Sequence, residues 1–164
     1  MKDTLKKGIV LVLLTIVIYK TLDVSFMCNN NFNMITVNTV LVGFLFTILT
    51  IIMSFTDEDV ISTYEKTNEL EKVYNNITTG IVLGVLSIAI AIITLCIWGE
   101  PLKQELTDVN KMMYSVIISM FVLIMKSILF AIIDINNIIT DIRRRKFTKS
   151  KQEKANKEME EKYK

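Results

Sequence analysis

The sequence predicts an all-α membrane protein that crosses the bilayer four times, with both termini in the cytoplasm. Hydrophobic residues make up 51% of the 164 residues, and they gather in four blocks instead of recurring at the periods typical of soluble helices and strands. Each block reaches the ~20 residues that a helix needs to cross ~30 Å of hydrocarbon. Basic residues concentrate near the two ends of the chain, which the positive-inside rule assigns to the cytoplasm.

The four apolar blocks predict four membrane-spanning segments. They cover residues 8–26, 34–55, 77–98 and about 112–134. A lone strand cannot pair its backbone polar groups in lipid, so each span is expected to be a helix. The first block follows three lysines, as a secretory signal would, but no small-x-small cleavage site comes after it. We therefore interpret it as a signal anchor that stays in the protein.

An acidic connection joins the second and third spans. Asp57, Glu58 and Asp59 follow a threonine. This order predicts a helix that begins with the threonine as its N-cap and carries negative charges in its first turn, where the helix dipole favours them. Tyr64 belongs to an apolar stripe at helical spacing farther along. These patterns predict a cytoplasmic helix over 56–76, which can run on into the third span because no proline interrupts it. We expect this helical hairpin to be a gating or partner-binding surface.

The fourth helix is too long for the membrane alone. From Met112 to Lys146 it contains 35 residues, which is about 52 Å at 1.5 Å per residue. Beyond the span its apolar residues narrow to a stripe of isoleucines, so the helix is expected to extend into the cytosol and to pack one face against the cytoplasmic helix. The four-span bundle is thus assigned to 1–146 and a basic cytoplasmic tail to 147–164.

A run of four basic residues leads into this tail: Arg143, Arg144, Arg145 and Lys146. Our main interpretation is that the run fixes the topology and contacts lipid headgroups. Two alternatives stay open. The basic residues can dock on the acidic hairpin, within or between subunits, or they can bind a soluble partner protein, a nucleotide or an oligonucleotide.

One charge lies deep inside an apolar span. Lys126 is the only charged residue well inside the fourth span, and such a group normally faces a bundle interior or water. At 100° per residue it shares a face of the fourth helix with four other polar residues, and this polar stripe consists of Ser115, Ser119, Lys126, Asn137 and Arg144. The functional interpretation is the wall of an aqueous pore at the axis of an oligomer. The alternatives are that Lys126 snorkels to the headgroups or pairs with Asp134.

The third span carries a stripe of small residues, namely Gly80, Gly84, Ser87 and Ala91. Small side chains let membrane helices approach closely, so we expect this stripe to pack against another helix of the same or a neighbouring chain. Cys28 and Cys96 both fall near the outer face. A disulfide between them is possible in principle, but spacing alone does not make a bond, and two reduced thiols are favoured.

Several classes of protein are excluded by what the chain lacks. It contains no histidine and only two cysteines, so one chain cannot build a Cys₄ zinc site. It contains no P-loop, HExxH, GxSxG or glycine-rich nucleotide fingerprint. We therefore expect no enzyme activity, no bound metal and no cofactor.

In outline the chain resembles the small multi-span membrane effectors of bacterial anti-phage and abortive-infection systems. The resemblance rests on the four spans, the cytoplasmic hairpin and the charged tail, and on no diagnostic motif. It implies a protein of the bacterial inner membrane that assembles with copies of itself and compromises the bilayer when a cytoplasmic signal arrives. The sequence therefore favours a homo-oligomeric pore gated from the cytoplasm. The alternative is a non-conducting membrane anchor that recruits a soluble partner through the acidic hairpin and the basic tail.

Overall fold

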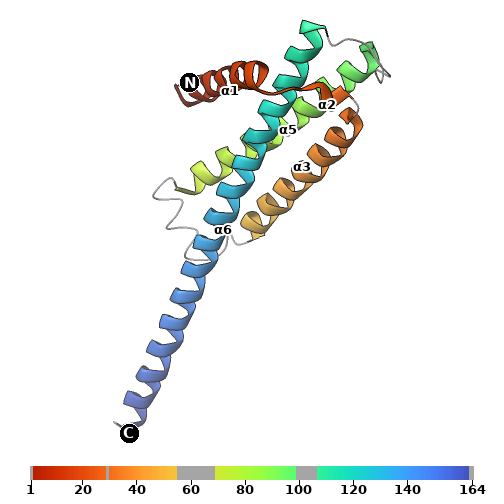
Figure 1. Cartoon of the computed structure of the whole chain (residues 1–164). Coiled ribbons are helices and arrows are strands. Elements are labelled where there is room, and N and C mark those ends of the chain that lie inside the picture. Colours follow the sequence, from red (N-terminus) through yellow and green to blue (C-terminus); the bar gives the residue numbers. More distant parts are fainter. Residues whose placement is uncertain (1, 29, 55–68, 99–106, 163–164) are drawn as a thin grey trace.

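The computed structural model describes residues 2–28, 30–54, 69–98 and 107–162, and all the regular structure in these segments is helical. The helices, shown in Figure 1, are α1 (Lys2–Thr21), α2 (Ser25–Cys28), α3 (Asn31–Ser54), α5 (Glu69–Trp98) and α6 (Asp108–Lys162). The predicted all-α class is therefore confirmed for the described segments. The first eight residues of α5 belong to the stretch predicted as a cytoplasmic helix, and they are continuous with the third apolar block. The remainder of that predicted helix lies outside the described residues.

Three of the described helices are long and apolar enough to cross a membrane. They are α3, the Leu70–Ile97 part of α5, and α6. The first predicted crossing has a different form, because α1 ends at Thr21 and the short helix α2 begins at Ser25. Its apolar part, residues 8–21, is about 21 Å long as a helix, which is less than the ~30 Å of a hydrocarbon core. A fourth crossing stays a prediction.

The core of the bundle lies between α3, α5 and α6. Leu45 and Ile48 of α3 join Ile77 of α5 and Ile124 of α6 in one cluster of buried side chains. Leu45 packs beside Gly80, and Val42 packs beside Gly84, so residue numbers fall along α3 as they rise along α5. The two helices are therefore antiparallel neighbours.

Helix α1 packs against the first half of α6. Ile18 is buried in a second cluster with Tyr114 and Ile117 of α6. Figure 1 shows α1 with its axis turned away from the direction that α3 and α6 share. The ammonium of Lys7 reaches α5, where it donates a hydrogen bond of 2.7 Å to the Thr79 hydroxyl. Helix α1 therefore contacts the bundle through polar as well as apolar groups.

Helix α6 continues far beyond the bundle. It contains 55 residues, about 82 Å at 1.5 Å per residue, and Ile142 is the last of its residues that is buried in the core. From residue 143 to residue 159 every side chain is exposed, and Figure 1 shows this part projecting alone. The helix can continue because residues 108–162 contain no glycine or proline. Glu–Lys pairs at i, i+4, such as Glu153 and Lys157, also favour it. The segment predicted as a basic tail is therefore helical as far as Lys162.

Candidate functional site

The polar stripe predicted on α6 divides into two parts in the structure. Ser115 and Ser119 are completely buried within a single chain. The Ser119 hydroxyl donates to the Ser115 carbonyl at 2.6 Å and lies 3.1 Å from the Thr15 hydroxyl of α1. Helix α1 therefore covers this end of the stripe, and the two serines bond inside the bundle.

The other members of the stripe are exposed. Lys126, Asn137 and Arg144 all have accessible side chains. The Lys126 ammonium lies 5.7 Å from the centre of the Phe130 ring one turn along the same helix, at a distance typical of a cation–π contact. The five residues thus share a helical face, as their spacing predicts, but only the part not covered by α1 is open.

The small-residue stripe of α5 packs inside the chain. Gly80, Gly84, Ser87 and Ala91 are all buried. A Cβ added at Gly80 would lie 2.8 Å from the Leu45 side chain and 2.8 Å from Cβ of Ser127. One added at Gly84 would overlap Val42. The helices that approach this stripe are therefore α3 and α6 of the same chain.

Two asparagines of α3 add polar links that the sequence interpretation did not include. The Asn38 side chain donates to Ser87 Oγ at 2.9 Å, and the Asn31 side chain donates to the Ala91 carbonyl at 3.0 Å. Both asparagines are buried. Only Asn38 lies inside the predicted second span, and it was an available signal because a polar side chain in such a segment usually bonds to a neighbouring helix.

An unpredicted row of small side chains runs along the outer face of α3. Its six members are Thr36, Thr39, Gly43, Thr47, Thr50 and Ser54. They follow the spacing i, i+3, i+7, i+11, i+14, i+18, which keeps them on one face of a helix. Every one of them is exposed, and we call this row the α3 hydroxyl stripe. Helix α3 carries no charged residue, so these hydroxyls are the principal polar groups on its outer face.

The hydroxyls of this stripe bond to their own helix. Thr36, Thr39, Thr47 and Thr50 each donate to the backbone carbonyl four residues earlier, and Ser54 donates to the carbonyl three residues earlier. Their donor needs are met without a partner, while the oxygens keep lone pairs that can accept from outside. No neighbouring side chain covers Gly43, because a Cβ built there would meet nothing within 4 Å. The stripe therefore presents a shallow, hydroxyl-rich track.

The signal for this stripe was present in the sequence. Thr36 and Thr47, and likewise Thr39 and Thr50, are eleven residues apart, which is close to three helical turns. The second span was predicted only as a membrane-crossing segment, because hydropathy averages over such a pattern. A helical projection of the hydroxyl positions would have identified it.

Comparisons of the chain with family models, with curated proteins and with solved structures each found no match. The function is therefore argued from the arrangement of residues alone.

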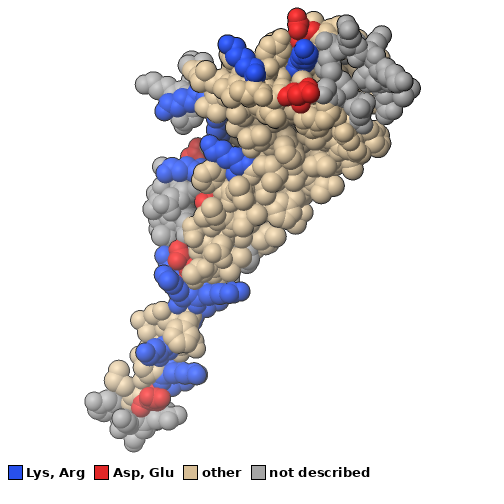
Figure 2. All heavy atoms as spheres, in the orientation of Figure 1, with Lys and Arg blue, Asp and Glu red and all other residues tan. Residues whose placement is uncertain are grey.

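The predicted cytoplasmic surface is described only in part. Asp57, Glu58, Asp59 and Tyr64 lie outside the described residues. The basic run Arg143, Arg144, Arg145 and Lys146 is exposed where α6 leaves the bundle. Figure 2 shows basic side chains gathered there, below the broad uncharged surface of the bundle. A cationic collar next to an apolar belt suits contact with anionic headgroups.

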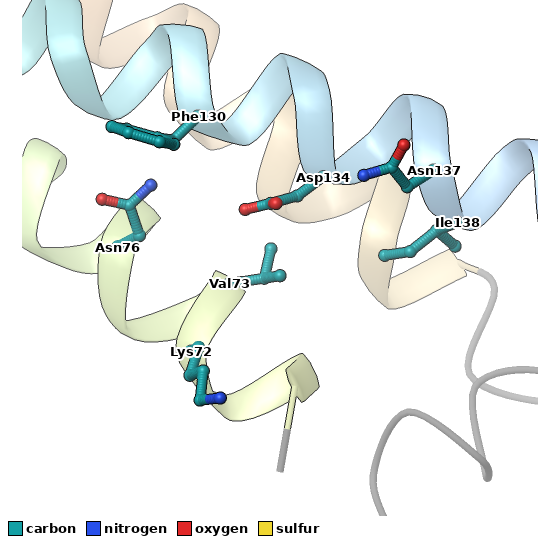
Figure 3. A pocket seen from close by; sticks show the side chains of 7 residues that line it. All are labelled: Lys72, Val73, Asn76, Phe130, Asp134, Asn137 and Ile138. Atoms are coloured by element: carbon teal, nitrogen blue, oxygen red, sulfur yellow. The ribbon is translucent and has the colours of Figure 1, made fainter. Parts of the chain in front are cut away.

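A cavity of about 430 Å³, lined by both polar and apolar side chains, lies between α5 and α6. Figure 3 shows the carboxylate of Asp134 and the carboxamide of Asn76 projecting into the space between the two helices. Val73 and Ile138 supply apolar walls, and Asn137 also lines the cavity. This space, which we call the α5/α6 cavity, brings residues from far apart in the sequence to one place.

The described cysteine side chain gives no support to a disulfide. Cys96 is a free, exposed thiol, while the side chain of Cys28 lies outside what the structure describes. Within the described segments, no three His, Cys, Asp or Glu side chains gather in a group that could hold a metal ion.

Proposed function

We propose that this protein is the subunit of a homo-oligomeric membrane pore in which the α3 hydroxyl stripe faces the water path. In this proposal α1 joins α3, α5 and α6 in crossing the membrane, with both termini in the cytoplasm. The observation that carries it is the stripe itself. Six exposed small residues follow one face of an uncharged, membrane-length helix, from Thr36 to Ser54. Serine and threonine oxygens on such a face can accept hydrogen bonds from water along the whole path.

The path must lie between chains because the interior of one chain is packed. Ser115 and Ser119 of α6 are fully buried against α1, and Leu45, Ile77 and Ile124 fill the core between the other helices. A ring of copies would bring one α3 face from each subunit to a common axis. Small side chains on that face also let neighbouring helices approach closely.

The long α6 extension is suited to carry a signal from the cytoplasm. It is one continuous helix from the bundle to Lys162, and within the bundle α6 packs against α3 through Ile124 and Leu45. A ligand or partner that tilts the extension would therefore also move α3, the helix that we place at the pore. The resemblance in outline to bacterial anti-phage membrane effectors supports such a role in the inner membrane.

Ion flux from proteoliposomes tests the proposal. Valine has the shape of threonine without the hydroxyl, so a Thr47→Val, Thr50→Val double variant removes two groups that bind water. Each lost hydrogen bond is worth about 1 kcal/mol, so flux should fall roughly 10- to 30-fold. Thr140→Val is the matched control, because Thr140 is also exposed and bonds to its own helix but lies outside the stripe. Equal flux from the double variant and the control would remove α3 as the pore wall.

Stoichiometry in nanodiscs provides a second, independent test. A pore between chains requires a closed ring of several copies, and native mass spectrometry should detect four or more. A monomer in nanodiscs that conducts no ions would overturn the proposal.

One observation favours a second candidate function, a non-conducting anchor that recruits a soluble partner. The α6 extension presents 17 consecutive exposed residues, from 143 to 159, on which a soluble partner can dock. This function predicts a heteromeric complex on co-purification, its loss when residues 147–164 are deleted, and no conductance from the purified chain.

A further inference from the structure

The α5/α6 cavity lies where the apolar surface of the bundle gives way to charge. On α6 the exposed apolar residues Leu129 and Ile133 come just before Asp134, and the basic run begins at Arg143. On α5 the membrane-length apolar segment begins at Leu70, next to Lys72. Both helices are long and apolar enough to cross a membrane. The change from apolar to charged surface therefore puts this cavity at the depth of lipid headgroups.

The cavity combines one anionic group, one cationic group and two carboxamides. Asp134 supplies a carboxylate, Lys72 an ammonium, and Asn76 and Asn137 the carboxamides. Figure 3 shows Asp134 and Asn76 facing the space between the helices, whereas Lys72 projects from the side of α5 that is turned away from Asp134. Among the described residues no cation lies within ion-pair distance of Asp134. A carboxylate that is partly removed from water favours a bound cation.

We propose that this cavity binds the headgroup of a phospholipid that carries a primary ammonium and a phosphodiester, as phosphatidylethanolamine does. The lipid ammonium has three N–H donors, and the two oxygens of the Asp134 carboxylate are its principal acceptors. The Asn76 oxygen already accepts a hydrogen bond of 3.5 Å from the Ser127 hydroxyl. The phosphodiester lies against Lys72, which binds phosphate as a point charge. Both ends of a zwitterionic headgroup are thereby satisfied in one site.

The surroundings of the cavity suit an attached lipid better than a soluble zwitterion. Phe130 lines the cavity and is 47% exposed, and Leu129 beside it is 59% exposed. These exposed apolar side chains lie next to the cavity on the side toward the centre of α6, where acyl chains can contact them; the Lys126 ammonium also lies there, 5.7 Å from the centre of the Phe130 ring. The volume of about 430 Å³ is within the ~300–1,000 Å³ range of small-molecule sites.

The inference does not rest on the proposed pore, since lipid binding can be measured whether or not the protein conducts. Its test is native mass spectrometry of the delipidated full chain in detergent. The probes are phosphatidylethanolamine, phosphatidylcholine and phosphatidylglycerol with identical acyl chains. Choline cannot donate hydrogen bonds, and phosphatidylglycerol has no cationic group. Phosphatidylethanolamine should therefore bind at least about threefold more tightly than phosphatidylcholine or phosphatidylglycerol.

Two variants separate the parts of the headgroup. Asp134→Asn should abolish the preference for ethanolamine over choline, whereas Lys72→Gln should weaken all three lipids by a similar factor. Asp108→Asn is the matched control, because Asp108 is an exposed aspartate at the opposite end of the apolar part of α6. Circular dichroism of each variant shows whether the helices are retained. An ethanolamine preference that survives in Asp134→Asn would overturn the proposal, and so would equal binding of the three lipids by the unmodified chain.

Soluble phosphoethanolamine distinguishes a lipid from a free headgroup. It carries the same ammonium and phosphate without acyl chains, so it should displace bound phosphatidylethanolamine only at far higher concentration. Displacement at concentrations equal to those of the lipid would show that the acyl chains contribute nothing, and the assignment to a lipid would then be wrong.

Discussion

The side chain of Asn38 donates a hydrogen bond to the Ser87 hydroxyl across the interface of α3 and α5, with Nδ2 and Oγ 2.9 Å apart. Both residues are completely buried. One turn away, Gly84 of α5 packs directly against the Val42 side chain of α3. In an apolar bundle such a bond competes with no water, so it selects one register between the two helices. A shift of one residue would leave both polar groups facing hydrocarbon.

A double-mutant cycle of Asn38→Ala and Ser87→Ala measures this link. Interhelical hydrogen bonds in membrane bundles are worth about 0.6 kcal/mol on average and up to ~1.7 kcal/mol. We expect a coupling free energy in that range from unfolding in SDS–detergent mixed micelles. The control cycle pairs Asn38→Ala with Thr140→Ala, whose side chain bonds within α6 and should show no coupling. Equal coupling in the two cycles would contradict the assignment.

Replacing Gly84 with alanine should destabilise the bundle. The added Cβ overlaps the stiff Val42 side chain, and overpacking of this kind costs about 1–3 kcal/mol. Alanine recovers about 1 kcal/mol of helix propensity relative to glycine, so a net loss of about 1 kcal/mol is expected. Gly8→Ala is the control, because nothing lies within 4 Å of its Cβ position, and it should gain up to about 1 kcal/mol. If both variants have the same unfolding free energy, the packing at Gly84 is looser than described.

Cysteines at positions 15 and 119 should form a disulfide on oxidation. The Thr15 and Ser119 hydroxyls lie 3.1 Å apart on facing helices, which is compatible with the short Cβ–Cβ distance of a disulfide. The measurement is a gel shift after oxidation, with Cys28 and Cys96 replaced by serine. Cysteines at positions 15 and 127 serve as the control, since position 127 is about 12 Å farther along α6. Cross-linking of the control pair alone would place α1 against a different part of α6.

Lys126→Leu should improve membrane insertion and leave conductance unchanged. Lys126 is exposed and contacts the Phe130 ring of its own helix, so its loss removes a contact worth only about 0.5–1 kcal/mol. A deep lysine costs about 2.5–3.5 kcal/mol in translocon insertion, and insertion efficiency of α6 should rise accordingly. Proteoliposome flux decides between two pore walls. A changed flux would indicate that the polar stripe of α6 lines the pore, whereas an unchanged flux is expected if α3 lines the pore.

The sequence alone determined the helical class and three of the membrane-length helices. Clustered apolar residues leave a helix as the structure that can pair its backbone in lipid, whatever lies beside it. Spacing likewise put Gly80, Gly84, Ser87 and Ala91 on one face of α5, and Lys126 on one face with Ser119. These are properties of a single helix, and they follow from 3.6 residues per turn.

Tertiary structure decided which of those faces are covered. Helix α1 buries Ser119 and leaves Lys126 open, although the two share a face, because the axis of α1 diverges from that of α6. The same packing turns the hydroxyls from Thr36 to Ser54 outward and brings Asp134 of α6 opposite Asn76 of α5. Periodicity fixes directions around one axis, whereas exposure depends on where the neighbouring axes run, and that depends on contacts between residues distant in the sequence.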